Sequence, residues 1–304
     1  MNIALIGYGE VGRILGEDLH AAGHAVTTFD VKLGTEAGVP VRAHALLRGV
    51  EVADSHAGAV RSAQLVVSAV TATQTVAAAQ ACARALPADT FFLDFNSASP
   101  AAKIAAAEYV GRAGGRYVEG AVMTSIPPHR MKVPLLLGGP HADALLPQLN
   151  KLGFAARVAS SQLGVASATK MCRSVMIKGL EAMLIESLTT ARRYGVEEAV
   201  LASLRETFPG IDWAEQATYF FQRVIKHGRR RAEEMREAAV TVREAGLEPW
   251  IAIASAERQD WVADLVEKGA FGRKSRKKTG SADWRIAADL IIDHLAAKKA
   301  RKDG

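Results

Sequence analysis

Three glycines near the start of the chain are spaced as a phosphate-binding loop. Gly7, Gly9 and Gly12 lie in "ALIGYGEVG", which follows the apolar run 2–7 and opens a helical pattern over 10–22. The first glycine permits a tight turn, the second lets the backbone approach a pyrophosphate, and the third lets helix and strand pack closely. The helix N-terminus then offers unpaired N–H groups to the anion. The loop therefore predicts a dinucleotide-binding site.

An acidic residue at the end of the second expected strand indicates which dinucleotide binds. Asp30 ends "HAVTTFD", where a carboxylate accepts hydrogen bonds from the adenosine ribose and repels a 2′-phosphate. This favours NAD, while Lys32 and Arg48 leave NADP possible because either cation offsets the repulsion. The full set of expected cofactor-binding residues is Gly7, Tyr8, Gly9, Glu10, Val11, Gly12, Asp30 and Val70.

A lysine in a long, mostly apolar helical pattern is the second chemical candidate. Lys170 lies in "ATKMCRSVMIKG" and follows the small residues "LGVASA". Oxidation of an alcohol sends a hydride to nicotinamide and a proton to a base, and the reverse reaction needs an acid; an amine facing the nicotinamide could do either. A lysine base near neutrality needs a pKa below its usual value of about 10.4. Partial burial would lower that pKa, and Arg173 is one cation that would add to the effect.

Ser174 lies one helical turn beyond Lys170 and completes the pair of catalytic candidates. Its hydroxyl could hydrogen-bond the reacting oxygen or hold the lysine. The competing interpretation is structural: Lys170 extends from a buried helix and makes an ion pair. The dinucleotide loop earlier in the chain favours catalysis.

The pattern of the first 160 residues predicts the elements that carry these groups. Short apolar runs alternate with helical segments, which is typical of a largely parallel sheet covered on both faces. The expected strands are 2–7, 24–30, 65–70, 90–95, 116–123, 133–139 and 154–160. We predict an α/β Rossmann domain with a mostly parallel, doubly wound sheet over residues 1–162.

The second half of the chain is helical in pattern throughout. Helical periodicity continues over 163–194, a length of about 45 Å at about 1.5 Å per residue. Further helical segments are expected at 196–206, 211–243, 248–267 and 282–299. We predict an all-α domain over residues 163–304, joined to the first domain by the long helix. So long and apolar a helix would be over-exposed in a lone small domain, so we also expect a homodimer formed through the helical domain.

Three local matches give the chain a resemblance to a known family. The first is the glycine loop. The second is "DFNSASP" (94–100), which is similar to a D-x-x-[ST]-x-x-P substrate-binding segment. The third is "LGVASATKMCRS", with Gly164 in a small-residue lead-in to Lys170. With these matches and its order of domains, the chain resembles the β-hydroxyacid dehydrogenases, which include 6-phosphogluconate and 3-hydroxyisobutyrate dehydrogenases.

The resemblance implies an NAD(P)-dependent oxidoreductase that acts on the 3-hydroxyl of a small hydroxy acid. Lys170 would be the general acid/base. Ser97, with Asn96 beside it, would bind the substrate, and Thr124 and Ser125 would contribute to the same pocket. The implied partner is therefore a small hydroxy or keto acid, and loss of carbon dioxide after oxidation is left open.

The chain departs from the family pattern at several positions. Ala166 stands where a second glycine is common, and Ser174 where asparagine is expected. Met123, Thr124 and Ser125 fall where Ser-Gly-Gly is usual. In 226–249 the usual Lys-Asp pair is not clean, and we expect Arg229 to Arg231 to pair mainly with Glu233, Glu234 and Glu237. These departures indicate a divergent, phosphogluconate-dehydrogenase-like branch with an uncharacterised helical C-terminal domain.

Composition excludes several other classes of protein. The 304 residues are 49% hydrophobic and 23% charged, a globular balance. No apolar run reaches the roughly 18 residues needed to span a bilayer, and an expected strand beginning at Asn2 leaves no room for a signal peptide. Two cysteines, Cys82 and Cys172, argue against a disulfide scaffold and fit a cytoplasmic compartment. Scattered histidines and the absence of C-x-x-C and H-E-x-x-H motifs predict no metal site.

The excess of positive over negative charge lies in the C-terminal segment. Ten Lys or Arg and four Asp residues lie between Arg273 and Gly304, which accounts for the whole net charge of +6. We interpret "GRKSRKKTG" as a solvated segment and not as a nucleic-acid-binding surface. Two alternatives to the dehydrogenase remain: an imine or other C=N reductase on the same scaffold, and a catalytically silent dinucleotide-binding sensor.

Overall fold

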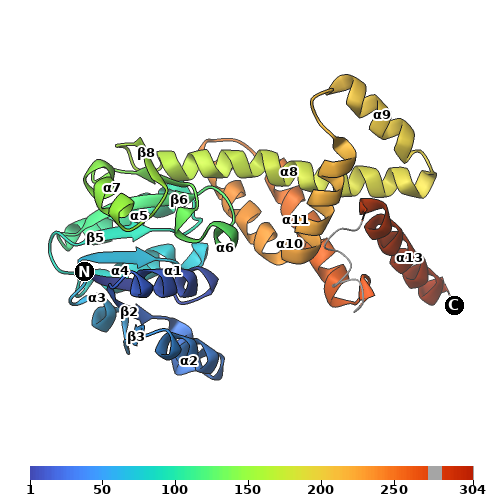
Figure 1. Ribbon diagram of the computed structural model, residues 1–304. Coiled ribbons are helices and arrows are strands. Elements are labelled where there is room, and N and C mark those ends of the chain that lie inside the picture. The colour runs from blue at the N-terminus through green and yellow to red at the C-terminus, as the bar shows by residue number, and fades with distance from the viewer. Residues whose placement is uncertain (273–282, 304) are drawn as a thin grey trace. The chain divides into compact units, whose positions relative to one another are not determined.

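The protein, shown in Figure 1 as a computed structural model, is described for residues 1–272 and 283–303. It divides into two compact units, Met1–Met171 and Cys172–Gly304, called unit 1 and unit 2 below. The chain passes from unit 1 to unit 2 within helix α8 (Val165–Tyr194). The basic stretch 273–280 that was interpreted as a solvated segment lies outside the described residues.

Unit 1 is built on one eight-stranded sheet, and its α/β class confirms the prediction. The strand order is β3-β2-β1-β4-β5-β6-β7-β8, and all neighbours are parallel except β6 and β7. The strands are β1 Asn2–Ile6, β2 Ala25–Phe29, β3 Glu51–Val52, β4 Leu65–Ser68, β5 Phe91–Asp94, β6 Arg116–Val122, β7 Leu135–Gly138 and β8 Ala156–Ser160.

Helices cover both faces of this sheet (Figure 1). They are α1 Glu10–Ala21, α2 Val39–Leu47, α3 His56–Val60, α4 Thr75–Ala83, α5 Pro100–Arg112, α6 Ile126–His129 and α7 Ala142–Lys151, with 3-10 turns η1 Val31–Gly34, η2 Glu36–Gly38, η3 Ala72–Gln74 and η4 Arg130–Lys132. In β1, Ile3 and Leu5 join the core beneath α1, α2 and α7, whereas Ala4 and Ile6 join the core beneath α3, α4 and α5. The alternation of side chains along a strand thus supplies two cores from one sheet.

The structure differs from the sequence prediction at short elements and at one strand direction. The two-residue strand β3 and helix α2 were not predicted, because neither has enough periodic residues to signal itself. Strand β7 runs antiparallel to β6. The connection between them, residues 123–134, holds just the single turns α6 and η4 and not the crossover helix that usually returns a chain to a parallel position.

Unit 2 is helical in all its described residues. Its helices are the remainder of α8, α9 Glu197–Thr207, α10 Trp213–Glu244, α11 Trp250–Glu267 and α13 Trp284–Asp303. Their shared core includes Leu188, Phe221, Val262 and Trp284. The all-α expectation is therefore confirmed.

Helix α10 is kinked beside a close contact with α11. His227 has non-helical backbone angles (φ −134°, ψ 20°). A Cβ on the next residue, Gly228, would lie 2.7 Å from the carbonyl oxygen of Gln259 in α11. Glycine is required there because two backbones approach more closely than a side chain allows.

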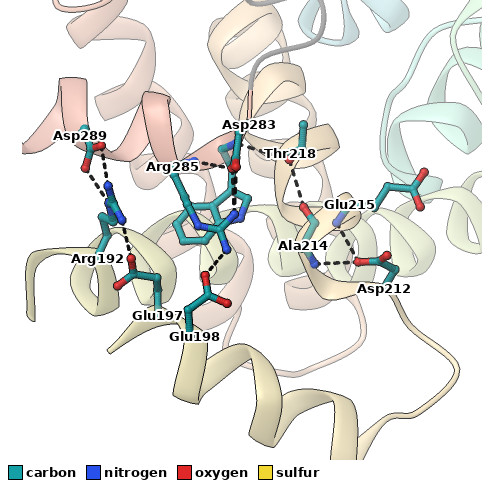
Figure 2. A network of polar contacts seen from close by, with 11 residues as sticks. Arg192, Glu197, Glu198, Asp212, Ala214, Glu215, Thr218, Asp283, Arg285 and Asp289 are labelled. Atoms are coloured by element: carbon teal, nitrogen blue, oxygen red, sulfur yellow. Dashed lines mark hydrogen bonds and ion pairs between the residues drawn. The ribbon is translucent and has the colours of Figure 1, made fainter. Parts of the chain in front are cut away.

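A network of ion pairs joins three helices of unit 2 (Figure 2). Arg192 of α8 pairs with Glu197 of α9 at 2.5 Å and with Asp289 of α13 at 2.8 Å. Arg285 of α13 also reaches Glu198 of α9. Most of these side chains are partly exposed, and exposed ion pairs add little to stability because water screens them.

Within residues 1–272 and 283–303, no helix combines the length and the apolar character needed to cross a membrane. Over the same residues, no group of three or more His, Cys, Asp or Glu side chains is placed to hold a metal ion. Both cysteines are free; Cys82 is buried and Cys172 is exposed.

Candidate active site

The six parallel strands β1 to β6 of unit 1 end at one edge of the sheet, called the carboxyl edge below. Residues Ile6, Ser68 and Asp94, the last residues of β1, β4 and β5, lie in register with one another. In doubly wound sheets, ligands bind outside the carboxyl ends of the strands. The predicted residues that follow these strands are Gly7 after β1, Val70 after β4, Asn96 and Ser97 after β5, and Thr124 and Ser125 after β6.

The glycine loop, residues 7–12, has the geometry that its spacing predicts. Gly7 has φ +92°, and a Cβ there would lie 2.6 Å from the carbonyl oxygen of Ala69. A Cβ on Gly12 would lie 2.2 Å from the carbonyl oxygen of Gly7. By contrast, a Cβ on Gly9 would meet no heavy atom within 4 Å. Gly7 and Gly12 are therefore needed by the fold, whereas the space beside Gly9 is open.

The first turn of α1 fits an anion. Gly9 is its N-cap and has no side chain that could hydrogen-bond the first N–H groups of the helix. Those groups and the open space beside Gly9 suit a pyrophosphate. Asp30 is hydrogen-bonded to the loop. Its carboxylate accepts from Tyr8 N at 2.8 Å and from Lys32 N at 2.9 Å. The residues present therefore fit a dinucleotide.

The side chains of the other predicted cofactor residues differ in how far they are buried. The Tyr8 ring is fully buried, and burial, followed by the charge of Glu17, raises the pKa of its phenol to about 12. It packs into the core, so its backbone alone belongs to the loop. Val11 packs partly on the same core, Glu10 is exposed, and Val70 is half-buried.

A matched pair of substitutions separates the role of the loop in binding from its role in folding. We expect Gly9→Ala to leave the thermal midpoint unchanged and to weaken NADH binding at least about tenfold, because the new methyl occupies open space where a pyrophosphate would lie. Gly12→Ala should instead lower the thermal midpoint, because its methyl overlaps the Gly7 backbone. Differential scanning fluorimetry and NADH fluorescence titration measure both. Equal NADH affinity for Gly9→Ala and the wild type would contradict this assignment.

Both polar atoms of the Asn96 side-chain amide are hydrogen-bonded within unit 1. Its Oδ1 accepts from Val70 N at 2.7 Å, and its Nδ2 donates to Ser68 Oγ at 3.1 Å. The residue is 4% exposed, and its own N–H donates to Asp94 Oδ1 at 2.8 Å. Asn96 thus fixes the turns after β4 and β5 relative to each other.

The structure brings Lys170 to Ser97. Lys170 lies early in α8, is half-buried, and its Nζ donates a hydrogen bond to Ser97 Oγ at 2.5 Å. Thr124 is exposed and Ser125 half-buried, both just before α6, and Arg173 is exposed. The lysine that sequence reasoning selected therefore lies at the carboxyl edge with the predicted substrate-binding serine.

Glu119 positions the start of α8, and sequence reasoning missed it. Its carboxylate is fully buried and accepts from Ala166 N at 2.9 Å and from Ser167 Oγ at 2.8 Å. Gly138 on β7 leaves the room that this carboxylate needs, since a Cβ there would lie 2.2 Å from Glu119 Oε1. A single acid inside the apolar strand "RYVEGAV" was the available signal. It holds the helix three residues before Lys170.

Ser174 lies one turn beyond Lys170 on the same helix, in the part that belongs to unit 2. It is 6% exposed, and its Oγ accepts a hydrogen bond from Lys178 Nζ at 3.0 Å.

Comparisons with known proteins show which family the chain resembles. Residues 2–143 match the model of the NAD binding domain of 6-phosphogluconate dehydrogenase. A conserved protein of unknown function, whose structure revealed similarity with 3-hydroxyacid dehydrogenases, is 29% identical, with 88% of this chain and 99% of that chain covered and a TM-score of 0.71. A conserved hypothetical protein from Sinorhizobium meliloti 1021 is 36% identical over 95% of this chain and 96% of its own, with a TM-score of 0.75. The chain belongs to the β-hydroxyacid dehydrogenase family.

It is a divergent member of that family. Residues 191–262 match a domain of unknown function, DUF1932. The 3-hydroxyisobutyrate dehydrogenase of Mycobacterium tuberculosis, solved with L-serine, is 15% identical over 95% of this chain and 98% of its own, with a TM-score of 0.70, and so shares the fold. Other proteins of the fold have been solved with NAD+ and with NADP+. Because residues 2–143 match an NAD binding domain, the cofactor of this β-hydroxyacid dehydrogenase family member is NAD(P).

Proposed function

We propose that this chain is an NAD(P)-dependent dehydrogenase acting on the 3-hydroxyl of a small hydroxy acid, with Lys170 as general acid/base. The observation that carries the proposal is the 2.5 Å hydrogen bond from Lys170 Nζ to Ser97 Oγ at the carboxyl edge. That edge also carries the glycine loop. An amine and a hydroxyl held together beside a dinucleotide loop are the groups that alcohol oxidation needs.

The glycine loop would hold the pyrophosphate, and Asp30 would accept hydrogen bonds from the adenosine ribose. We expect a preference for NAD because the Asp30 carboxylate would repel a 2′-phosphate. Arg48, one of the cations that could offset this repulsion, pairs with Glu17 at 3.1 Å. The nicotinamide supplies the hydride acceptor in oxidation and the hydride donor in reduction.

The proton would move at Lys170. In oxidation its neutral amine takes the proton of the C3 hydroxyl while the hydride leaves C3; in reduction its ammonium returns that proton to the alkoxide. Because Ser97 Oγ accepts from Lys170, its own hydrogen is available to a substrate oxygen. We assign Thr124, Ser125 and Ser174 to the substrate as further hydroxyl ligands, and Asn96 to holding the turn that presents Ser97.

A panel of 3-hydroxy acids tests the proposal. Aliphatic, phosphorylated and aryl members are assayed with NAD and with NADP in parallel, and cyclic imines are assayed with NADH and NADPH. We expect at least one hydroxy acid to reduce NAD with a higher kcat/KM than NADP. Turnover of imines alone would replace the proposal with C=N reduction. NADH binding without turnover of any member would replace it with a silent dinucleotide-binding protein.

A further inference from the structure

Helix α8 carries a second buried lysine, which contacts Ser174. Lys178 Nζ donates to Ser174 Oγ at 3.0 Å and pairs with Glu234 of α10 at 2.8 Å. Lys178 and Ser174 are each 6% exposed. The Lys178–Ser174–Glu234 cluster belongs entirely to unit 2. It thus places a buried charge directly behind one of the proposed substrate-binding hydroxyls.

The contact with Lys178 fixes which way the Ser174 hydroxyl points. An ammonium group is a donor without acceptor capacity, so Ser174 Oγ must accept from Lys178 and its own hydrogen must point elsewhere. Among residues 1–272 and 283–303, that hydrogen has no acceptor, because the bond from Lys178 is the one hydrogen bond of the Ser174 side chain. A buried donor without an acceptor costs free energy, and an accepting ligand atom removes that cost.

Stability alone gives a weak reason for the cluster. Removing two charges from water costs about as much as their pairing returns, so well-packed apolar side chains would serve as well. A second buried pair, Arg231 with Glu181, lies near it. Burial lowers the pKa of Lys178, against the opposing effect of the Glu234 carboxylate. The unused hydroxyl hydrogen is the feature that an ion pair for stability does not require.

We propose that Lys178, anchored by Glu234, holds Ser174 as a hydrogen-bond donor to the substrate carboxylate and so selects acids over their uncharged analogues. Lys178 is a positioning residue: it acts through Ser174 and through its charge behind that hydroxyl. The inference rests on the proposed function, because it takes the acceptor to be the carboxylate of a hydroxy acid.

The test compares each active hydroxy acid with its primary amide, in the full chain with saturating NAD. The variants are Lys178→Met, Ser174→Ala, the double variant, and Lys178→Gln, which keeps a donor without the charge. Lys268→Met is the control, since it removes an exposed lysine of the same unit (61% exposed). Thermal midpoints and NADH affinities are measured for all of them, and Lys178→Gln replaces Lys178→Met if the latter does not fold.

We expect Lys178→Met to lower kcat/KM for the acid about 10- to 100-fold, the effect of one hydrogen bond to a charged group, and to change that for the amide little. Lys178→Gln should recover part of the loss, and the double variant should be no worse than the worse single one. Equal losses for acid and amide, additive effects, or an effect on thermal midpoint alone would overturn the inference while leaving the proposed function standing. If the wild type oxidises no acid but binds NADH, both the proposed function and this inference are wrong.

Discussion

Replacing Lys170 with alanine is expected to lower kcat about 10²- to 10⁴-fold, the usual contribution of a general acid/base. NADH affinity should be unchanged, because the glycine loop and Asp30 are expected to hold the cofactor. Stopped-flow measurement of hydride transfer and NADH fluorescence titration give the two quantities separately. A slower hydride transfer with unchanged NADH affinity would show that Lys170 acts in the chemical step and not in cofactor binding.

Added primary amines give a second readout of this prediction. If an amine at this position exchanges the proton, methylamine should restore part of the rate of Lys170→Ala, with a dependence on amine pKa. Lys170→Arg should stay slow because guanidinium does not lose its proton near neutral pH. Lys151→Ala, which removes an exposed lysine at the end of α7, is the control. A rate for Lys170→Ala close to that of this control would exclude Lys170 from the chemistry.

The parts of the fold that the sequence predicts are those set by local physics. The apolar strand, the glycine spacing and Asp30 lie within the first thirty residues. Together they form the turn between β1 and the N-terminus of α1, so their pattern can be recognised locally. The long helix was predicted to begin near residue 163, and α8 begins at Val165. Its periodicity continues over so many residues that no competing pattern interrupts it.

Side-chain partners distant in the sequence could not be predicted in the same way. Arg130 lies in the connection between β6 and β7, and its guanidinium pairs with Glu17 and Asp18 of α1, more than a hundred residues away. Nothing in the loop sequence favours these carboxylates over any others.

The arginines of α10 show the same limit. They were expected to pair mainly with acids on their own helix. Instead Arg229 pairs with Asp260, Asp264 and Glu267 of α11, and Arg231 with Glu181 of α8. Helix packing thus gives Arg229 and Arg231 partners on other helices, whereas Arg230 does approach its i+4 neighbour Glu234, at 4.0 Å.

A buried ion pair beneath Asn96 and Ser97 leads to the second large expected effect. Asp94 and Lys103 are each 1% exposed, and Lys103 Nζ lies 2.8 Å from Asp94 Oδ1. The same carboxylate accepts from Tyr117 OH at 2.6 Å and from Asn96 N at 2.8 Å. Burial, followed by the charge of Asp94, raises the pKa of Tyr117 well above its usual value, so the phenol stays a donor. One carboxylate thus accepts from Lys103, Tyr117 and Asn96, and Lys103 Nζ also donates to the Asp94 backbone carbonyl at 2.9 Å.

Asp94→Asn or Lys103→Met should therefore each lower the free energy of unfolding by about 3–5 kcal/mol, because each leaves its partner charged and buried alone. The double substitution should cost clearly less than the sum, since it leaves no unpaired charge. Urea unfolding with hydrogen exchange of peptides covering β5 and β6 measures this in unit 1. Arg112→Met is the control: it breaks an exposed pair with Glu108 on the same helix as Lys103 and should cost at most about 1 kcal/mol. Additive costs, or single costs no larger than that of Arg112→Met, would mean that water reaches the pair and that the turn carrying Ser97 is held by its backbone alone.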